Sequence, residues 1–127
     1  MGRRNPTYCT SLGKAILANL PETVAAKLID KIQFRAFTRH TCTNASRLRK
    51  ELKVVRERGY AIDDEEIEEG LRCVGVPVWN HDEQVVAAVS IAGPSYRVGG
   101  EHLAGLVDMV VRTAHRLSNA LGSRKQP

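Results

Sequence analysis

Residues 72–92, RCVGVPVWNHDEQVVAAVSIA, hold the pattern that decides the fold of this 127-residue chain. Two apolar runs, 72–79 and 85–92, flank the polar segment NHDEQ, and their period of two predicts an antiparallel hairpin. Both faces of the second run are small or apolar, which predicts a strand covered on both sides. Pro77 has no backbone N–H, so its strand should lie at a sheet edge or carry a bulge there.

The segments around the hairpin show helical spacing instead. Helix-starting residues precede three stretches, namely Thr10 or Ser11, Pro21, and Asn44 or Ser46. The predicted inward residues are Leu12, Ala15, Ile16 and Leu20, then Val24, Leu28, Ile29 and Ile32, then Leu48, Leu52 and Val55. Gly59 would end the third helix, and residues 60–62 could form a short strand. A long last helix would bury Leu103, Leu106, Val107, Val110, Ala114, Leu117 and Leu121.

These elements predict the α/β (α+β) class, with an antiparallel sheet flanked by helices and a single domain over residues 1–127. Two or three strands against four helices make a thin sheet, with too few partners for a two-sided core. We therefore expect either that the chain is a fragment of a larger domain or that another subunit supplies the missing elements.

The composition is that of an ordinary globular protein, with 43% apolar and 26% charged residues. No apolar run approaches the ~20 residues that a membrane span requires, and no apolar stretch follows the N-terminal arginines. The three cysteines, Cys9, Cys42 and Cys73, are odd in number and widely spaced, which favours reduced thiols. We expect a cytoplasmic protein without a membrane partner.

The net charge of +5 raises the question of nucleic-acid binding. Lys and Arg concentrate at residues 47–58, where they alternate with Leu and Val at helical spacing, as on a solvated helix face. The sequence holds no helix-turn-helix, zinc finger or aromatic stacking platform. We therefore expect no DNA-binding domain in this chain.

The acidic run from Asp63 to Glu69 places six carboxylates in seven positions. It lacks the ligand spacing of an EF-hand loop, and nothing marks the separated partner that a glycosidase carboxylate pair needs. We interpret residues 64–69 as a solvated or inter-subunit loop and Asp63 as turned inward. A zinc site through Cys9, His40 and Cys42 would lack structural-zinc spacing. We expect no catalytic residue, no metal and no cofactor, which leaves a metal-dependent enzyme as the weakest hypothesis.

A group of small polar residues stands out from this apolar setting. Ser90 lies on the small-residue face of the second strand, Cys73 begins the first, and Asp63 follows a short apolar segment. The helix start at Ser11–Leu12 offers backbone N–H groups that could hold a carboxylate. Each residue alone has a structural explanation, as a cap, a core thiol or a bonded serine. Together they are typical of a small-ligand pocket.

Three blocks of the chain carry a resemblance to a known family. They are CTSLGKAILANLP at 9–21, LRKELKVVRERGYAIDDEE at 48–66, and EGLRCVGVPVWNHDEQVVAAVSIAGPSYR at 69–97. In this order and spacing they resemble the effector-binding domain of the IclR family of bacterial transcriptional regulators. The resemblance implies a GAF-like domain that binds a small metabolite and transmits its presence to a separate DNA-binding domain.

The resemblance also implies site residues. Backbone amides at Ser11 and Leu12 would bind the effector together with Asp63, Cys73 and Ser90. This chain departs from the family where Ala92 stands in place of a second serine and where Leu12 is bulky, which implies a partly apolar effector. Cys9 also stands where a histidine is common.

The family's helix-turn-helix domain, linker helix and first effector-domain elements have no counterpart here. We thus expect an N-terminally incomplete domain that contacts DNA only through a missing domain. Its partners would be a small organic acid and copies of itself, as a dimer or tetramer. The alternative is an oligomerisation module without a ligand response.

Overall fold

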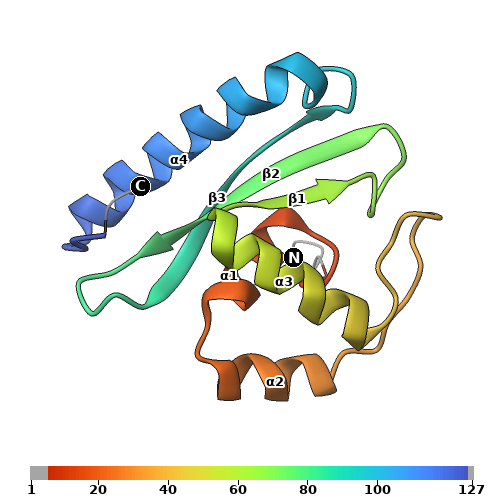
Figure 1. Cartoon of the computed structure of the whole chain (residues 1–127), viewed down its shortest axis with the longest axis horizontal. Coiled ribbons are helices and arrows are strands. Elements are labelled where there is room, and N and C mark those ends of the chain that lie inside the picture. The colour runs from red at the N-terminus through yellow and green to blue at the C-terminus, as the bar shows by residue number, and fades with distance from the viewer. Residues whose placement is uncertain (1–5, 126–127) are drawn as a thin grey trace, which may run out of the picture.

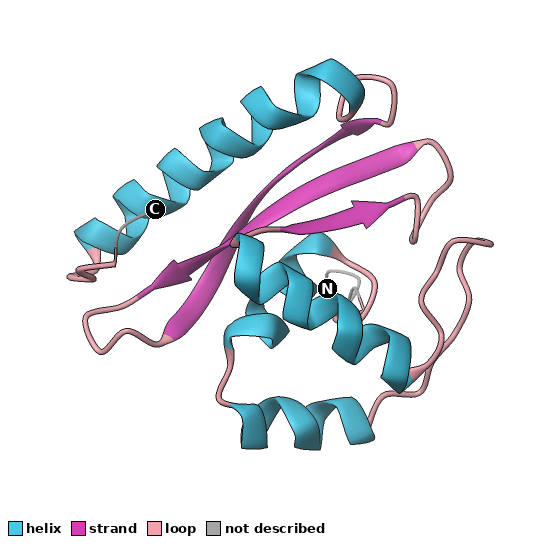
Figure 2. Ribbon diagram, in the orientation of Figure 1, coloured by secondary structure: helices cyan, strands magenta, loops and turns pink. Residues whose placement is uncertain are grey.

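The computed structural model describes residues 6–125 and places helices on both faces of a three-stranded antiparallel sheet (Figures 1 and 2). The strands are β1 (Ala61–Asp64), β2 (Leu71–Trp79) and β3 (Val85–Pro94), in the spatial order β1-β2-β3. On one side lie α1 (Ser11–Asn19), α2 (Glu22–Asp30) and α3 (Ala45–Arg58). On the other lies α4 (Leu103–Ala120), which follows the short 3₁₀ helix η1 (Gly100–His102). The predicted α+β class is confirmed.

The hairpin of β2 and β3 forms as the sequence predicts, with β2 in the centre of the sheet. The pairing of β1 with β2 ends at Gly75, so Pro77 lies where β2 has a neighbour on one side only. The register shifts between Val78 and Trp79, one residue beyond the proline. Pro77 is therefore accommodated on a central strand because that part of the strand behaves as an edge.

The prediction that the second strand is covered on both faces is wrong for the described residues. β3 is an edge strand, and Val86, Ser90 and Ala92 on it are exposed. Only part of the strand is sheltered on the side of α1, where Ala88 packs against the core. The apolar character of β3 thus exceeds what residues 6–125 bury.

Alternating residues of the strands pack against different helices on the two faces of the sheet. Val76 and Val78 of β2 pack against Val110 and Ala114 of α4. The opposite face carries the intervening residues of β2, including Gly75, and is covered by α1, on which α3 packs (Figure 1). The core therefore consists of two apolar layers that the thin sheet separates.

The helix caps are those that the sequence predicts. The hydroxyl oxygen of Thr10 accepts a hydrogen bond from the Gly13 amide at 3.1 Å, and the Asn44 side chain accepts one from Arg47 at 2.8 Å. Gly59 ends α3 with φ at 90°, in the left-handed region that favours glycine. The buried stripe of α3, Leu48, Leu52 and Val55, is confirmed.

The predicted stripes of the other helices are partly wrong. On α1, Leu12 is 41% exposed, whereas the buried side is formed by Ser11, Gly13, Lys14, Ala15, Leu17 and Ala18. On α2, Val24 and Leu28 are exposed. On α4, Leu117 is exposed, as is Leu121 at its C-cap. Ser118 is buried, and its hydroxyl accepts a hydrogen bond from the Trp79 amide and donates one to the Ala114 carbonyl. Close backbone approach on α1 and side-chain hydrogen bonds on α4 accompany these departures from the hydrophobic pattern.

None of the described helices is both long and apolar enough to span a membrane.

We predict that Gly75→Ala lowers the free energy of unfolding by about 1–3 kcal/mol, as overpacking in a core does. A Cβ at this position would lie 2.5 Å from the Ser11 carbonyl oxygen, so α1 would have to move. Denaturant titration would measure the loss.

The matched control is Gly105→Ala in α4, where a Cβ meets no atom within 4 Å. It should stabilise the helix by up to about 1 kcal/mol, because alanine has the higher helix propensity. Equal effects of the two variants would contradict the close contact.

Candidate functional site

The first turn of α1 lies directly on the sheet at Gly75. A Cβ on Gly75 would lie 2.5 Å from the carbonyl oxygen of Ser11 and 3.1 Å from the amide nitrogen of Leu12. The Gly13 and Lys14 amides donate to Thr10, whereas the amides of Ser11 and Leu12 precede the first intrahelical bond. Two helix-terminal N–H groups with a positive dipole are thereby held against the sheet. Glycine within a strand signals such an approach, but sequence reasoning did not single out Gly75.

The strand register brings the predicted side chains onto the same face as this turn. Asp63 of β1, Cys73 of β2 and Ala92 of β3 are direct partners in one row across the sheet. In the next row Gly75 pairs with Ser90. Directly opposed residues of antiparallel strands point to the same side of a sheet. The structure thus brings Asp63, Cys73, Ser90 and Ala92 together under the Ser11–Leu12 backbone.

The two ends of this face differ in their exposure to solvent. Asp63 is only 2% exposed and Cys73 is half-buried, whereas Ser90 and Ala92 on the edge strand are exposed. The Leu12 side chain also points to solvent, so the amide of Leu12 and not its side chain belongs to the face. The candidate site is therefore closed at β1 and open at β3.

The carboxylate of Asp63 already has a partner in the following turn. Its Oδ1 accepts a hydrogen bond from the Glu66 amide at 2.8 Å. Burial raises the pKa of Asp63, while this hydrogen bond and the charge of Lys14 act in the opposite direction. Asp63 thus holds the turn together and still has acceptor capacity, because an ionised carboxylate can accept several hydrogen bonds.

A buried lysine next to this turn escaped the sequence prediction. Lys14 is fully buried, and its Nζ donates to Glu51 Oε1 and to the Ile62 carbonyl, each at 2.5 Å, and to Glu66. Burial lowers the pKa of Lys14, but the carboxylates of Glu66 and Glu51 outweigh it and leave the pKa above its usual value. The signal in the sequence was its position, three residues after Ser11 on the inward side of α1.

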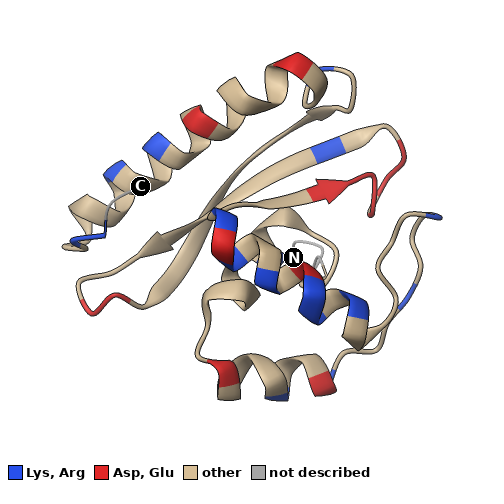
Figure 3. Ribbon diagram, viewed as in Figure 1, with Lys and Arg blue, Asp and Glu red and all other residues tan. Residues whose placement is uncertain are grey.

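Glu66 corrects the prediction that residues 64–69 form a solvated or inter-subunit loop. It is 6% exposed and contacts Lys14, and the Cys42 amide donates to its Oε1 at 3.3 Å. Burial raises the pKa of Glu66, because desolvation of the carboxylate outweighs the opposing effect of the Lys14 ammonium. Asp64, Glu68 and Glu69 are exposed, as the prediction has it, and acidic residues gather at this end of the sheet while basic ones line α3 (Figure 3).

The three cysteines are free thiols, and Cys9 and Cys42 are buried. Burial raises the pKa of Cys9 to about 12 and that of Cys73 to about 11. Within residues 6–125 no three His, Cys, Asp or Glu side chains converge on a position that could hold a metal ion. Cys9, His40 and Cys42 therefore do not form a zinc site.

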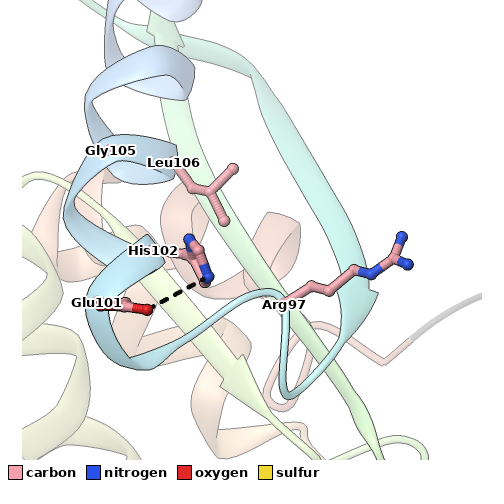
Figure 4. A pocket seen from close by; sticks show the side chains of 5 residues that line it. All are labelled: Arg97, Glu101, His102, Gly105 and Leu106. Carbon is pink, nitrogen blue, oxygen red and sulfur yellow. Dashed lines mark ion pairs between the residues drawn. The ribbon is translucent and has the colours of Figure 1, made fainter.

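Three surface hollows lie away from this face. One of about 610 Å³ at the start of α4 is lined by Arg97, Glu101, His102, Gly105 and Leu106, with the Glu101 and His102 side chains 4.0 Å apart (Figure 4). A second, of about 780 Å³, lies among α1, α2 and α3, and a third, of about 500 Å³, lies beside Trp79 and Pro21. None of the three is lined by a residue of the predicted site.

Comparison with known proteins gives one consistent result. The family described as bacterial transcriptional regulator IclR, C-terminal, matches residues 1–119. The HTH-type transcriptional regulator XynR of Escherichia coli is 40% identical over 122 residues, which are 96% of this chain and 48% of that protein. The chain thus spans about half the length of the curated relatives that it matches.

Solved structures show the same fold. The C-terminal domain of E. coli KdgR superposes with a TM-score of 0.90 at 37% identity, covering 97% of this chain and 75% of that one. The inducer-binding domain of the Acinetobacter transcription factor PobR, solved as a double mutant with 3-hydroxybenzoic acid, superposes with a TM-score of 0.85 at 30% identity. That match covers 94% of this chain and 71% of the PobR chain.

We predict that Cys73 reacts slowly with iodoacetamide in the folded protein. With its pKa raised from 9.0 to about 11, the thiol holds about 100-fold less thiolate at pH 8 than an ordinary cysteine. The alkylation rate, followed by mass spectrometry, should keep rising up to about pH 11. The same cysteine in urea-unfolded protein is the control, and a folded-state midpoint near pH 9 would contradict the burial.

Proposed function

The chain belongs to the IclR family of bacterial transcriptional regulators, and on this premise we propose that it senses a small organic acid and thereby controls DNA binding by a full regulator. The family comprises regulators and not enzymes, and the matched part is its effector-binding domain.

The observation that carries the proposal is the contact of the α1 start with Gly75 beside the row of Asp63, Cys73 and Ala92. Free amides at a helix N-terminus favour an anion, because the donors and the dipole both point at it. The neighbouring row supplies a buried carboxylate, a thiol and a methyl group. This combination suits a ligand that carries a carboxylate, a polar group and an apolar part.

Electrostatics decide the orientation of such a ligand. A ligand carboxylate next to Asp63 would place two like charges in a buried setting, which is unfavourable. We therefore assign the ligand carboxylate to the Ser11 and Leu12 amides, and a hydroxyl or other donor to Asp63. Cys73 and Ser90 would contact the middle of the ligand, and Ala92 its apolar part. The 3-hydroxybenzoic acid bound to the PobR domain has these three features.

The signal would pass through the assembly of subunits. A ligand can shift an arrangement only if it binds one arrangement better than another. We propose a homo-oligomer, a dimer or a tetramer, in which contact with DNA is made by a separate helix-turn-helix domain in the bacterial cytoplasm. The exposed edge of β3 lies beside Ser90 and Ala92. A ligand in the site would therefore alter the contacts of a subunit that packs against this edge.

The alternative, an oligomerisation module without a ligand response, has its own supporting observation. Exposed apolar side chains lie on α2, on α4 and at the C-cap of α4, namely Val24, Leu28, Met109, Leu117 and Leu121. Sedimentation at several protein concentrations, with a thermal-shift screen of small acids, separates the two hypotheses. Assembly without any ligand response would favour the module.

We predict that the domain binds at least one acid from a panel of pyruvate, gluconate and 3-hydroxybenzoate, and that Asp63→Asn weakens this binding about tenfold or more. Asparagine keeps an oxygen for the Glu66 amide but loses the charge that accepts a ligand donor. Isothermal titration calorimetry measures both affinities.

Asp82→Asn is the matched control, because Asp82 is exposed in the turn between β2 and β3. It should leave the affinity unchanged. Undiminished heat in the double variant Asp63→Asn with Ser90→Ala would remove the assigned site.

A further inference from the structure

We propose that Lys14 is the positioning residue of this site, holding the first turn of α1 and the Asp63 turn in the arrangement that accepts the effector. The inference rests on the proposed function for its ligand. Its structural part, the dependence of Asp63 on Lys14, can be tested without one.

The ammonium group of Lys14 connects three segments of the chain. It reaches Glu51 on α3, the Ile62 carbonyl on β1 and Glu66 in the turn after β1. With no exposed surface, it has only protein oxygens as partners among the described atoms. No other described side chain makes ion pairs to two carboxylates. The Lys14 ammonium is therefore the group that the neighbouring carboxylates share.

These contacts lie next to the predicted ligand contacts at the Ser11 and Leu12 amides and at Asp63. Lys14 follows Ser11 by one turn on the same helix, so its anchorage also sets the position of the Ser11 and Leu12 amides. Ile62 immediately precedes Asp63, and the Glu66 amide donates a hydrogen bond to the Asp63 carboxylate. One ammonium therefore ties the carboxylate-binding end of the site to its acceptor end.

The charge of Lys14 also affects the pKa of Asp63. The groups that face Asp63 are Lys14 from α1, Asp64 and the Glu66 and Ile67 amides from its own turn, and the thiols Cys73 and Cys9. Glu51 from α3 and Glu66 compete for the same ammonium. Because burial already raises the pKa of Asp63, the charge of Lys14 keeps that carboxyl available as an acceptor.

Stability alone would not require a lysine here. Taking an ion network out of water is costly, and well-packed apolar residues of similar volume often stabilise a core as much or more. A charged network that joins the two ends of a candidate site therefore fits a positioning role better than a purely structural one.

The test is an NMR titration of the isotope-labelled domain that follows the Asp63 carboxyl carbon and the amides of Ser11, Leu12 and Glu66. In Lys14→Met the midpoint of Asp63 should move to higher pH, because the nearby positive charge is lost. The three amide signals should shift together. Lys14→Arg should restore the midpoint toward that of the unchanged domain.

The matched control is Arg49→Met, which removes the exposed ion pair with Asp30 on the outer side of α3. It should move neither the midpoint nor the three amides. If Lys14→Met does not fold, Lys14→Gln takes its place, since it keeps hydrogen-bond donors without the charge. An unmoved Asp63 midpoint in either folded variant would overturn the proposal, and so would failure of both to fold, which would leave Lys14 a stability residue.

Calorimetry with 3-hydroxybenzoate, gluconate and pyruvate separates this inference from the proposed function. Where the unchanged domain binds an acid, Lys14→Met should weaken it about tenfold and Lys14→Arg should recover most of the loss. Full affinity in Lys14→Met would contradict the positioning role. If the unchanged domain binds none of the three acids while the Asp63 midpoint still follows Lys14, the proposed ligand class fails and the positioning of Asp63 stands.

Discussion

The contact between the Ser11 carbonyl and Gly75 is the constraint on which the rest of this structure depends. A side chain at position 75 would collide with the helix backbone, so α1 can rest on the sheet only because that strand position has no Cβ. The same contact turns the small side of α1 inward and brings Lys14 into the core. It also sets two free helix amides beside the row of Asp63, Cys73 and Ala92. The same contact therefore determines both the packing of α1 on the sheet and the position of the candidate site.

Burial of Lys14 joins several elements in the apolar layer between the sheet and α3. Its partners come from α3, from β1 and from the turn that follows β1, so elements distant in sequence meet at one ammonium. The apolar residues around it form a cluster that includes Leu48, Val55 and Cys42. In such a setting an unpaired charge is costly, which makes the geometry of the network well defined.

The layer formed by α4 and the edge strand β3 are more exposed to solvent than the Lys14 network. α4 covers one face of β2 and β3, yet several of its apolar residues remain exposed, and within residues 6–125 no strand pairs with the outer edge of β3. The candidate site is therefore buried at Asp63 and open at Ser90. Under the proposed function, ligand occupancy at the buried end would influence what packs at the open end.

The sequence by itself determined the hairpin, the helix caps, the stop at Gly59 and the α+β class, because these depend on local period and on backbone preferences. It also indicated the residues that gather on one face, since strand register follows from alternation once the hairpin is known. The inward stripes of α1, α2 and α4, the exposure of β3 and the burial of Glu66 could not be predicted in this way. They depend on the helix backbone that reaches Gly75, on the edge position of β3 in the described sheet, and on a lysine 52 residues away that pairs with Glu66. Only the tertiary structure decided these points, because a buried charge and a close backbone contact are properties of pairs of residues and not of either residue alone.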